Sequence, residues 1–251
     1  MAEAQGLQSY NQILQSERAQ GRILPDYDRR VGLVKRVLGK LIAGGDLGAS
    51  GDGDNWEVYV IEDPGTQNAF VLPGNKVFVY SGILPICGGE DGLAAVLGHE
   101  IAHNIASHSA ERMSSMLPLT LLSFGFIALD WSGITFGLPI GQYIGNTLLD
   151  LIFAKPAGRQ QESEADFIGL LLMAKSCYDP RAAVGLWERM DKAHQDAPPE
   201  WLSTHPSNAN RVGKIKEWLP EAEEAAQSAG CAVTAGFMKG FERALPGKAF
   251  W

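Results

Sequence analysis

The chain has 251 residues, 45% of them hydrophobic and 20% charged, and is therefore long enough to bury one sizeable hydrophobic core. Its formal net charge of −8 argues against a nucleic acid as partner. The sequence contains no internal repeat and no nucleotide-binding loop of the pattern G-x-x-x-x-G-K-[ST], so we do not expect a nucleotide to drive its reaction.

Two helices are predicted near the N-terminus, over residues 6–18 and 30–43, followed by an exposed Gly- and Asp-rich loop at 44–55. We assign residues 1–26 to an N-terminal helical arm. The first residues, MAEAQGLQSYNQ, lack the basic and then apolar run of a targeting peptide. If the protein is targeted to an organelle, we therefore expect its targeting segment and any membrane anchor to lie ahead of this chain.

Two segments rich in β-branched and aromatic residues, at 56–61 and 76–80, are predicted to be strands, with a Pro-Gly-Asn turn leading into the second. A strand beside an active site can pair with the extended backbone of a bound peptide. An ordinary core strand is an equal alternative for the second segment. The candidates for a substrate-binding strand are Val77, Phe78, Val79 and Tyr80.

The most informative motif is H-E-x-x-H, formed by His99, Glu100 and His103 within a Pro-free helix predicted over residues 91–113. Residues four apart lie on the same side of a helix, so both imidazoles can reach one metal ion. Glu100 lies one position further round, where its carboxylate can take a proton from the attacking water. This arrangement is typical of the zinc site of a metallopeptidase. The alternative is a core helix with incidental histidines.

The same helix carries an apolar pattern with a spacing of four residues, which predicts one buried stripe. Its members are Leu93, Leu97, Ile101 and Ile105. His108 follows His103 by more than one helical turn and is not expected to be a ligand. His194 lies in a charged stretch and is expected to be solvated.

The segment 116–153 is apolar, and Asp130 and Asp150 are its only charged residues. The glycines, proline and amides of its longest uncharged stretch, residues 131–149, make it poor material for a spanning helix of ~20 apolar residues. Three alternatives remain: a buried hairpin over the cleft, a patch resting in the membrane interface, or a true span. Apolar surface of this size, if exposed, would favour self-association, so a homo-oligomer is compatible with the sequence.

A second helix predicted at 159–174 offers a third metal ligand, which catalytic zinc usually requires. Glu162 and Asp166 are four apart and share a face, whereas Glu164 points about 200° away from Glu162. One carboxylate of the pair could bind the metal while the other orients a histidine ring. The alternative is a solvated acidic first turn, which also suits the helix dipole.

Further helices are predicted after Pro180 and after Pro206. His205 precedes a proline and is therefore expected in an extended or turn conformation. Residues 221–251 are assigned to a C-terminal tail whose aromatic residues indicate that it docks on the domain.

The cysteines, at positions 87, 177 and 231, do not have the spacing of zinc ligands. Free thiols are the simplest state. A disulfide between Cys177 and Cys231 is the alternative in an oxidising compartment.

Four blocks resemble the zinc peptidase family of HtpX and the CaaX prenyl protease 1, which belongs to the gluzincins. They lie within residues 27–220, which we assign to one metallopeptidase domain. A small departure is Asn75, which stands where a second glycine is common. The blocks are residues 68–82 (NAFVLPGNKVFVYSG), 97–103 (LGHEIAH), 162–166 (ESEAD), and 203–207 (STHPS) with Arg211.

The resemblance implies an α+β, mainly helical, zincin-like fold with a small sheet beside the H-E-x-x-H helix. It implies one zinc ion (Zn2+) per chain, held by His99, His103 and Glu162, with Glu100 as general base. Further residues are expected to support this site. They are Asp166, which would orient a histidine, Arg211, which would anchor its loop to a carboxylate, and His205, which would stabilise the oxyanion or approach the metal.

The expected function is that of an ATP-independent zinc metalloendopeptidase acting on membrane-anchored protein substrates. The resemblance is strongest to mitochondrial inner-membrane members of the family. It therefore implies a catalytic domain facing the intermembrane space, a role in protein quality control and stress-activated processing of a dynamin-like GTPase. The alternatives are a bacterial envelope metallopeptidase of the same family and a metal-stabilised, chaperone-like binding module without turnover.

Overall fold

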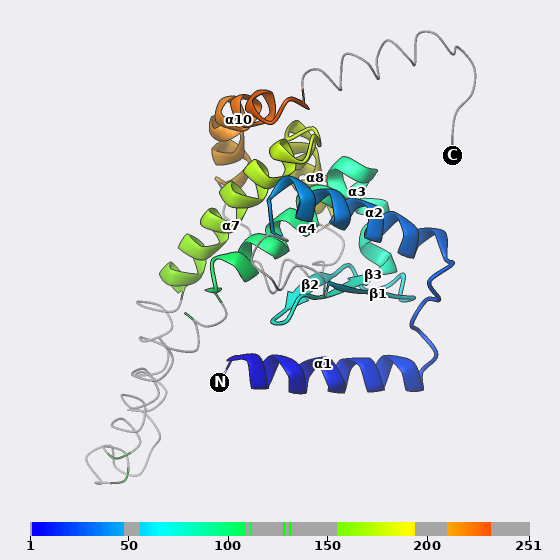
Figure 1. The fold of residues 1–251 in the computed structure, drawn as a ribbon. Helices are drawn as coiled ribbons and strands as arrows, with labels where there is room; N and C mark the ends of the chain where they lie inside the picture. The colour runs from blue at the N-terminus through cyan, green and yellow to red at the C-terminus, as the bar shows by residue number, and fades with distance from the viewer. Residues whose placement is uncertain are drawn as a thin grey trace.

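The computed structural model describes residues 2–47, 56–108, 111, 128, 131, 155–193 and 210–231. Over these residues the fold is α+β and mainly helical, with a small three-stranded sheet, as predicted (Figure 1). The helices are α1 (Ala2–Ala19), α2 (Arg29–Gly44), α3 (Leu84–Cys87), α4 (Glu90–Ile105), α7 (Lys155–Lys175), α8 (Arg181–Ala193) and α10 (Arg211–Ser228). The strands are β1 (Glu57–Ile61), β2 (Ala69–Leu72) and β3 (Lys76–Tyr80), and a 3-10 turn, η1 (Ser81–Ile83), follows β3.

The sheet has the order β1-β3-β2, with β3 in the centre. β1 runs parallel to β3, and β2 pairs with β3 as an antiparallel hairpin. The hairpin turn contains Gly74 and Asn75, which both adopt positive φ angles, of 83° and 62°. These conformations suit glycine and asparagine, so the turn chemistry fixes the hairpin.

The central position of β3 makes one sequence-based prediction wrong. Every residue of β3 has a partner in β1, and the residues from Lys76 to Val79 also have partners in β2. The backbone of β3 is therefore already paired on both sides, and Val77, Phe78, Val79 and Tyr80 cannot accept an added substrate strand. Among the described strands, the edge beside α4 belongs to β2, which contacts that helix.

The two faces of the sheet have different neighbours. Val60, Val77 and Val79 belong to the hydrophobic core that the sheet shares with α2 and α4. The opposite face is aromatic: the Phe78 ring stacks on Tyr59 with a centroid distance of 5.1 Å and lies 6.2 Å from the Tyr10 ring of α1. Helix α1 therefore covers the aromatic face, on the far side of the sheet from the other helices (Figure 1).

Helix α4 is the central helix of the core, but it is shorter than predicted. Leu93, Leu97 and Ile101 are fully buried, whereas Ile105 is 49% exposed. The predicted stripe is therefore wrong at its last member. The helix ends there because Ser107 adopts a left-handed conformation with a φ of 55°, which turns the chain.

Helices α4 and α7 approach each other closely at two glycines. A Cβ atom at Gly169 would lie 2.9 Å from the Gly98 carbonyl carbon and 2.9 Å from the His99 backbone nitrogen. A Cβ atom at Gly98 would be tightly placed, 3.0 Å from the Gly169 carbonyl oxygen. The two glycines therefore allow the close approach that brings the H-E-x-x-H motif against α7.

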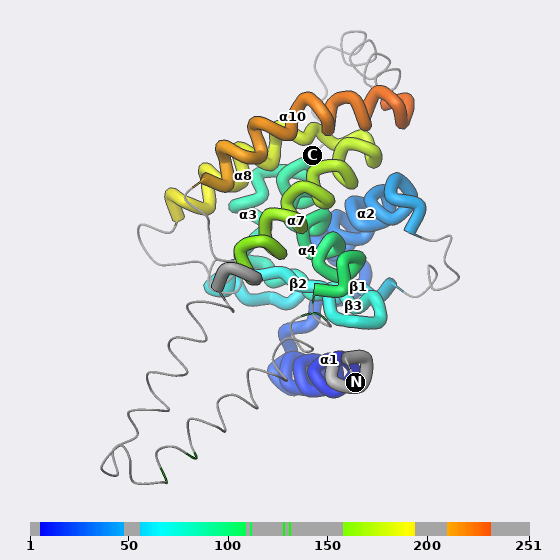
Figure 2. The backbone as a smooth tube through the Cα atoms, turned by 90° about the vertical axis from the view of Figure 1, so that its left-hand side faces the viewer, coloured from blue at the N-terminus to red at the C-terminus, as the bar shows by residue number. Residues whose placement is uncertain are grey.

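Helix α10 packs against α7 and α8, and these three helices lie on the side of α4 that is away from the sheet (Figure 2). α10 continues through residue 220, so the expected domain boundary lies inside a helix, and Ala222 beyond it is fully buried.

A disulfide joins Cys177 to Cys231, while Cys87 is a buried free thiol. The simpler expectation of free thiols is therefore wrong for Cys177 and Cys231.

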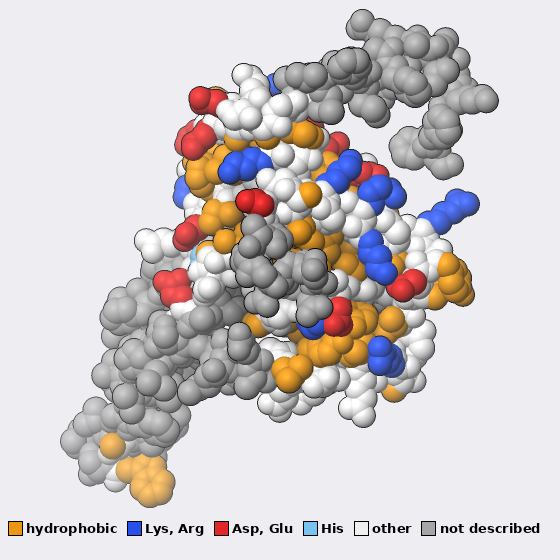
Figure 3. Space-filling view, in the orientation of Figure 1, with side chains coloured by type: hydrophobic (Ala, Val, Ile, Leu, Met, Phe, Trp, Pro, Cys, Tyr) orange, Lys and Arg blue, Asp and Glu red, His pale blue; other side chains and the backbone are white. Residues whose placement is uncertain are grey.

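None of the described helices is long and apolar enough to span a membrane. The alternatives for residues 116–153 lie outside the described residues, apart from the helical positions 128 and 131. His194, His205 and the aromatic tail also lie outside them. On the face shown in Figure 3, acidic and basic side chains are interspersed over the described helices.

Candidate metal centre

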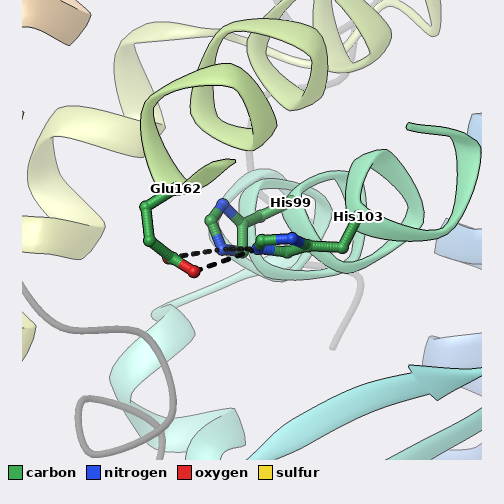
Figure 4. A group of neighbouring side chains, drawn as sticks. All are labelled: His99, His103 and Glu162. Carbon is green, nitrogen blue, oxygen red and sulfur yellow. Dashed lines mark hydrogen bonds and ion pairs between the residues drawn. The ribbon is translucent and has the colours of Figure 1, made fainter. Parts of the chain in front are cut away.

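Three predicted ligands converge between α4 and α7 (Figure 4). His99 and His103 lie one turn apart on α4, with their Nε2 atoms 3.1 Å from each other. Glu162 of α7 brings its Oε2 within 3.3 Å of His99 Nε2 and its Oε1 within 3.3 Å of His103 Nε2. All three ligand atoms lie within 4.8 Å of one another. Two imidazole nitrogens and one carboxylate oxygen therefore face the same point.

The other ring nitrogen of His99 faces Asp166, as predicted for a carboxylate one turn after Glu162. His99 Nδ1 lies 3.0 Å from Asp166 Oδ1, and Arg211 Nη2 donates a hydrogen bond of 2.5 Å to the same oxygen. Arg211 is buried, with its guanidinium carbon 3.3 Å from the ring centroid of Trp187. Trp187 of α8 thus packs beneath the site, a contact that no sequence motif indicated.

The outer nitrogen of His103 has a different neighbour. His103 Nδ1 lies 2.8 Å from the Nδ1 of His108, which is buried, and His108 Nε2 lies 3.4 Å from Glu164 Oε2. Neither residue is expected near the ligands from the sequence, because His108 follows His103 by more than one helical turn and Glu164 points about 200° away from Glu162 on its own helix. The break at Ser107 brings His108 back.

The two ligand histidines differ in charge in the metal-free protein. Burial lowers the pKa of His99, but hydrogen bonds to Asp166 and Glu162 outweigh it and raise the pKa to about 9. Burial dominates at His103 and lowers its pKa to about 4. At Asp166, burial is opposed by the charge of Arg211 and by His99, which together lower the pKa of the carboxyl. Neutral His103 is ready to bind a cation, whereas His99 must lose its proton first.

The donor set fits a zinc ion. Two imidazoles and one carboxylate are a common set of protein ligands at catalytic zinc, and the buried Glu162 has Arg211 Nη1 at 3.6 Å. Glu100 is buried beside these ligands, and its charge favours protonation of His103. The site thus combines three candidate metal ligands with a carboxylate, that of Glu100, which lies on the same turn of α4 as His99 and His103.

The structure brings together His99, His103 and Glu162 with Asp166 and Arg211. Val77, Phe78, Val79 and Tyr80 stay in the sheet, and Phe78 is fully buried. His205 lies outside the described residues, so its predicted role stays a prediction.

An H-E-x-x-H helix, a glutamate on a second helix and a small mixed sheet together define a zincin-type metallopeptidase site. The model of peptidase family M48 matches residues 29–219, more than half of the chain, and the chain therefore belongs to this family. The predicted family resemblance is confirmed.

The chain is similar to mitochondrial metalloendopeptidases named OMA1. It is 46% identical to the Schizosaccharomyces pombe protein over 214 residues, which cover 84% of this chain and 59% of that protein. It is 37% identical to the human protein over 216 residues, covering 83% of this chain and 41% of the relative. The Escherichia coli β-barrel assembly-enhancing protease is 32% identical over 157 residues, or 59% of this chain and 31% of that protein. The chain thus spans three fifths or less of each of these relatives.

Proposed function

We propose that this chain is the catalytic part of an ATP-independent zinc metalloendopeptidase. The observation that carries the proposal is the convergence of His99, His103 and Glu162 around one point, with Glu100 buried on the same helix. Membership of peptidase family M48 supports it independently, because this family implies a metal. Protein substrates follow from a peptidase activity.

His99, His103 and Glu162 would hold one zinc ion per chain. When bound, zinc supplies a Lewis acid that polarises the scissile carbonyl and lowers the pKa of water. Glu100 takes the proton from the attacking water and delivers it to the leaving amine. Asp166, fixed by Arg211, keeps the His99 ring oriented. We assign His205 to stabilisation of the oxyanion, as the family resemblance implies.

The outer edge of β2 is the surface we propose for an extended substrate. β2 is antiparallel to β3 and contacts α4, so a peptide added at this edge would run past the metal ligands. This replaces the predicted role of β3. Recognition through the main chain suits a protease that accepts varied sequences.

The proposed setting is the mitochondrial inner membrane, with the catalytic domain facing the intermembrane space. The mitochondrial names of the relatives support the organelle. A role in quality control, with stress-activated processing of a dynamin-like GTPase, is part of the proposal. So are membrane contact through residues 116–153 and homo-oligomer formation.

We also propose that residues 27–220 form the metallopeptidase domain, with 1–26 as an arm and 221–251 as a docking tail. The family match over residues 29–219 supports the first boundary. The buried Ala222 and the disulfide of Cys231 support docking of the first part of the tail.

The proposal is tested by cleavage of an unfolded protein by the zinc-loaded chain beside Glu100→Gln. Loss of the general base should slow cleavage by at least about 10²-fold while the zinc content stays at one per chain. Glu188→Gln, an exposed carboxylate of α8, is the matched control and should cleave like wild type.

Equal cleavage by wild type and Glu100→Gln would reveal a contaminating protease and overturn the mechanism. A wild type that binds one zinc but does not cleave would instead support the binding-module alternative. A higher identity to the mitochondrial relatives than to the bacterial one disfavours the bacterial alternative.

A further inference from the structure

We propose that His108 is a positioning residue for His103, and that Glu164 completes a hydrogen-bonded chain running from the metal ligand to the protein surface. The inference rests on the proposed function, because it takes His103 as a ligand. It gives a role to two residues that the mechanism does not use.

The contact exists because α4 ends early. In a continuous helix, His108 would lie about 140° around the axis from His103, too far for their rings to meet. Instead α4 ends at Ile105, and Ser107 has a φ of 55°. This turn places the His108 ring edge-on to His103, with centroids 4.9 Å apart and an interplanar angle of 70°. His108 is only 2% exposed there.

The geometry defines which nitrogen carries each proton. His103 Nε2 faces His99 and Glu162, so metal binding through this atom leaves the ring proton on Nδ1. His103 Nδ1 then donates to His108 Nδ1 across 2.8 Å. His108 must accept at Nδ1 and therefore carries its own proton on Nε2. That nitrogen lies 3.4 Å from Glu164 Oε2, a carboxylate acceptor.

The two ligand histidines are thus oriented by different means. His99 faces the buried carboxylate of Asp166, whose charge is balanced by Arg211. His103 faces a neutral imidazole, backed by a carboxylate whose side chain is 58% exposed. The three acidic residues of α7 have different partners. Glu162 faces His99 and His103, Asp166 faces His99, and Glu164 faces His108. Partners of this kind fix the ring and tautomer of a metal-binding histidine.

The test measures zinc affinity by competition with a chromophoric chelator, for four variants of the chain. His108→Phe keeps a ring but removes the acceptor and should weaken zinc binding about 10–100-fold. His108→Gln restores a carbonyl acceptor and should recover most of this loss. Glu164→Gln, at the exposed end of the chain, should weaken binding less than His108→Phe. Glu188→Gln is the matched surface control and should bind like wild type.

A second readout is the histidine tautomer in the zinc-loaded wild type, from long-range proton–nitrogen NMR. We expect His103 protonated at Nδ1 and His108 at Nε2. A His108 protonated at Nδ1 would overturn the inference, even if His108→Phe fails to fold.

The outcomes also separate the two proposals. Wild type that binds one zinc, with equal affinity in His108→Phe, would overturn the role of His108 and leave the metal site standing. Wild type that binds no zinc would overturn both.

Discussion

Arg211 shows how one residue can hold a metal-binding cluster together without touching the metal. Its guanidinium donates to Asp166, lies 3.6 Å from Glu162 and has its central carbon 3.3 Å from the ring centroid of Trp187. Two buried carboxylates on one helix face would repel each other without a nearby cation. The planar shape of the guanidinium lets it pack on an aromatic ring and bind a carboxylate at once, which lysine cannot reproduce.

Arg211→Met should therefore destabilise the metal-free protein by about 3–5 kcal/mol, because it leaves the two buried carboxylates, Asp166 and Glu162, with protonated His99 as their shared cation. The measurement is the urea concentration at the midpoint of unfolding. Adding Asp166→Asn to this variant should recover part of the loss, since a neutral amide needs no counter-charge. Arg181→Gln removes an exposed ion pair with Glu223 and should change stability by less than about 1 kcal/mol. An unchanged midpoint in Arg211→Met would contradict the role given to Arg211.

The residues of the site could be predicted where they follow a fixed spacing. His99, Glu100 and His103 come from a motif, and Glu162 and Asp166 share a face because they are four apart. His108 and Trp187 could not be found in this way. The contact of His108 depends on the left-handed Ser107, and that of Trp187 depends on how α8 packs against α4.

At the level of elements, the site depends on how closely α4 and α7 approach each other. At their crossing, a Cβ atom on Gly169 would meet backbone atoms of α4 at 2.9 Å, and one on Gly98 would meet the Gly169 carbonyl oxygen at 3.0 Å. Gly98 immediately precedes His99, so any separation of the helices moves this ligand away from Glu162.

Gly169→Ala should destabilise the fold by about 1–3 kcal/mol and weaken zinc binding, because its Cβ would meet backbone atoms that cannot rotate away. Gly158→Ala is the matched control: it lies in the same helix, and a Cβ there meets no atom within 4 Å. That control should be neutral or stabilising by up to about 1 kcal/mol through helix propensity. Both are measured by urea unfolding and zinc competition. If the two variants behave alike, the close approach at Gly169 does not matter to the site.

The sequence predicted most helices but missed β2 and overextended α4. β2 has only four residues and is followed at once by the Pro-Gly-Asn turn, so its strand signal is short. Residues 106–113 are compatible with a helix by composition, and the end of α4 arises from one backbone conformation that composition does not encode. The order of strands in the sheet likewise depends on non-local pairing, which reversed the expectation for β3.

On the scale of the whole molecule, α1 is attached to the rest mainly through the aromatic face of the sheet. Tyr10 donates a hydrogen bond to Glu57, which also receives one from Tyr59 and pairs with Lys76. These contacts connect the N-terminal helix to β1 and β3. One cluster that holds α1 to the sheet thus contains an ionisable carboxylate, Glu57.

This attachment should depend on pH. Hydrogen bonds from Lys76 and Tyr59 lower the pKa of Glu57 to about 2, from an ordinary value of 4.5. A lowered pKa means that the contribution of Glu57 is complete above pH 4.5 and is lost as the pH falls towards 2. The protection of the α1 amides against hydrogen exchange, relative to the intrinsic exchange rate at each pH, should therefore fall over this range. In Glu57→Gln the exchange should already be faster at neutral pH and should lack this acid step. The same acid step in both proteins would show that another group controls the arm.

The metal ligands sit far apart along the chain: His103 and Glu162 are separated by 59 positions. Bringing them together closes a long loop, and the entropic cost of closing a loop grows only with the logarithm of its length. Doubling such a loop costs only about 0.6 kcal/mol. The stretch between the two ligand helices can therefore gain or lose many residues, and acquire new contacts of its own, while the catalytic geometry stays fixed by the glycine crossing. Insertions between the two ligand helices should therefore alter the contacts that the protein makes with other molecules, while its affinity for the metal stays the same.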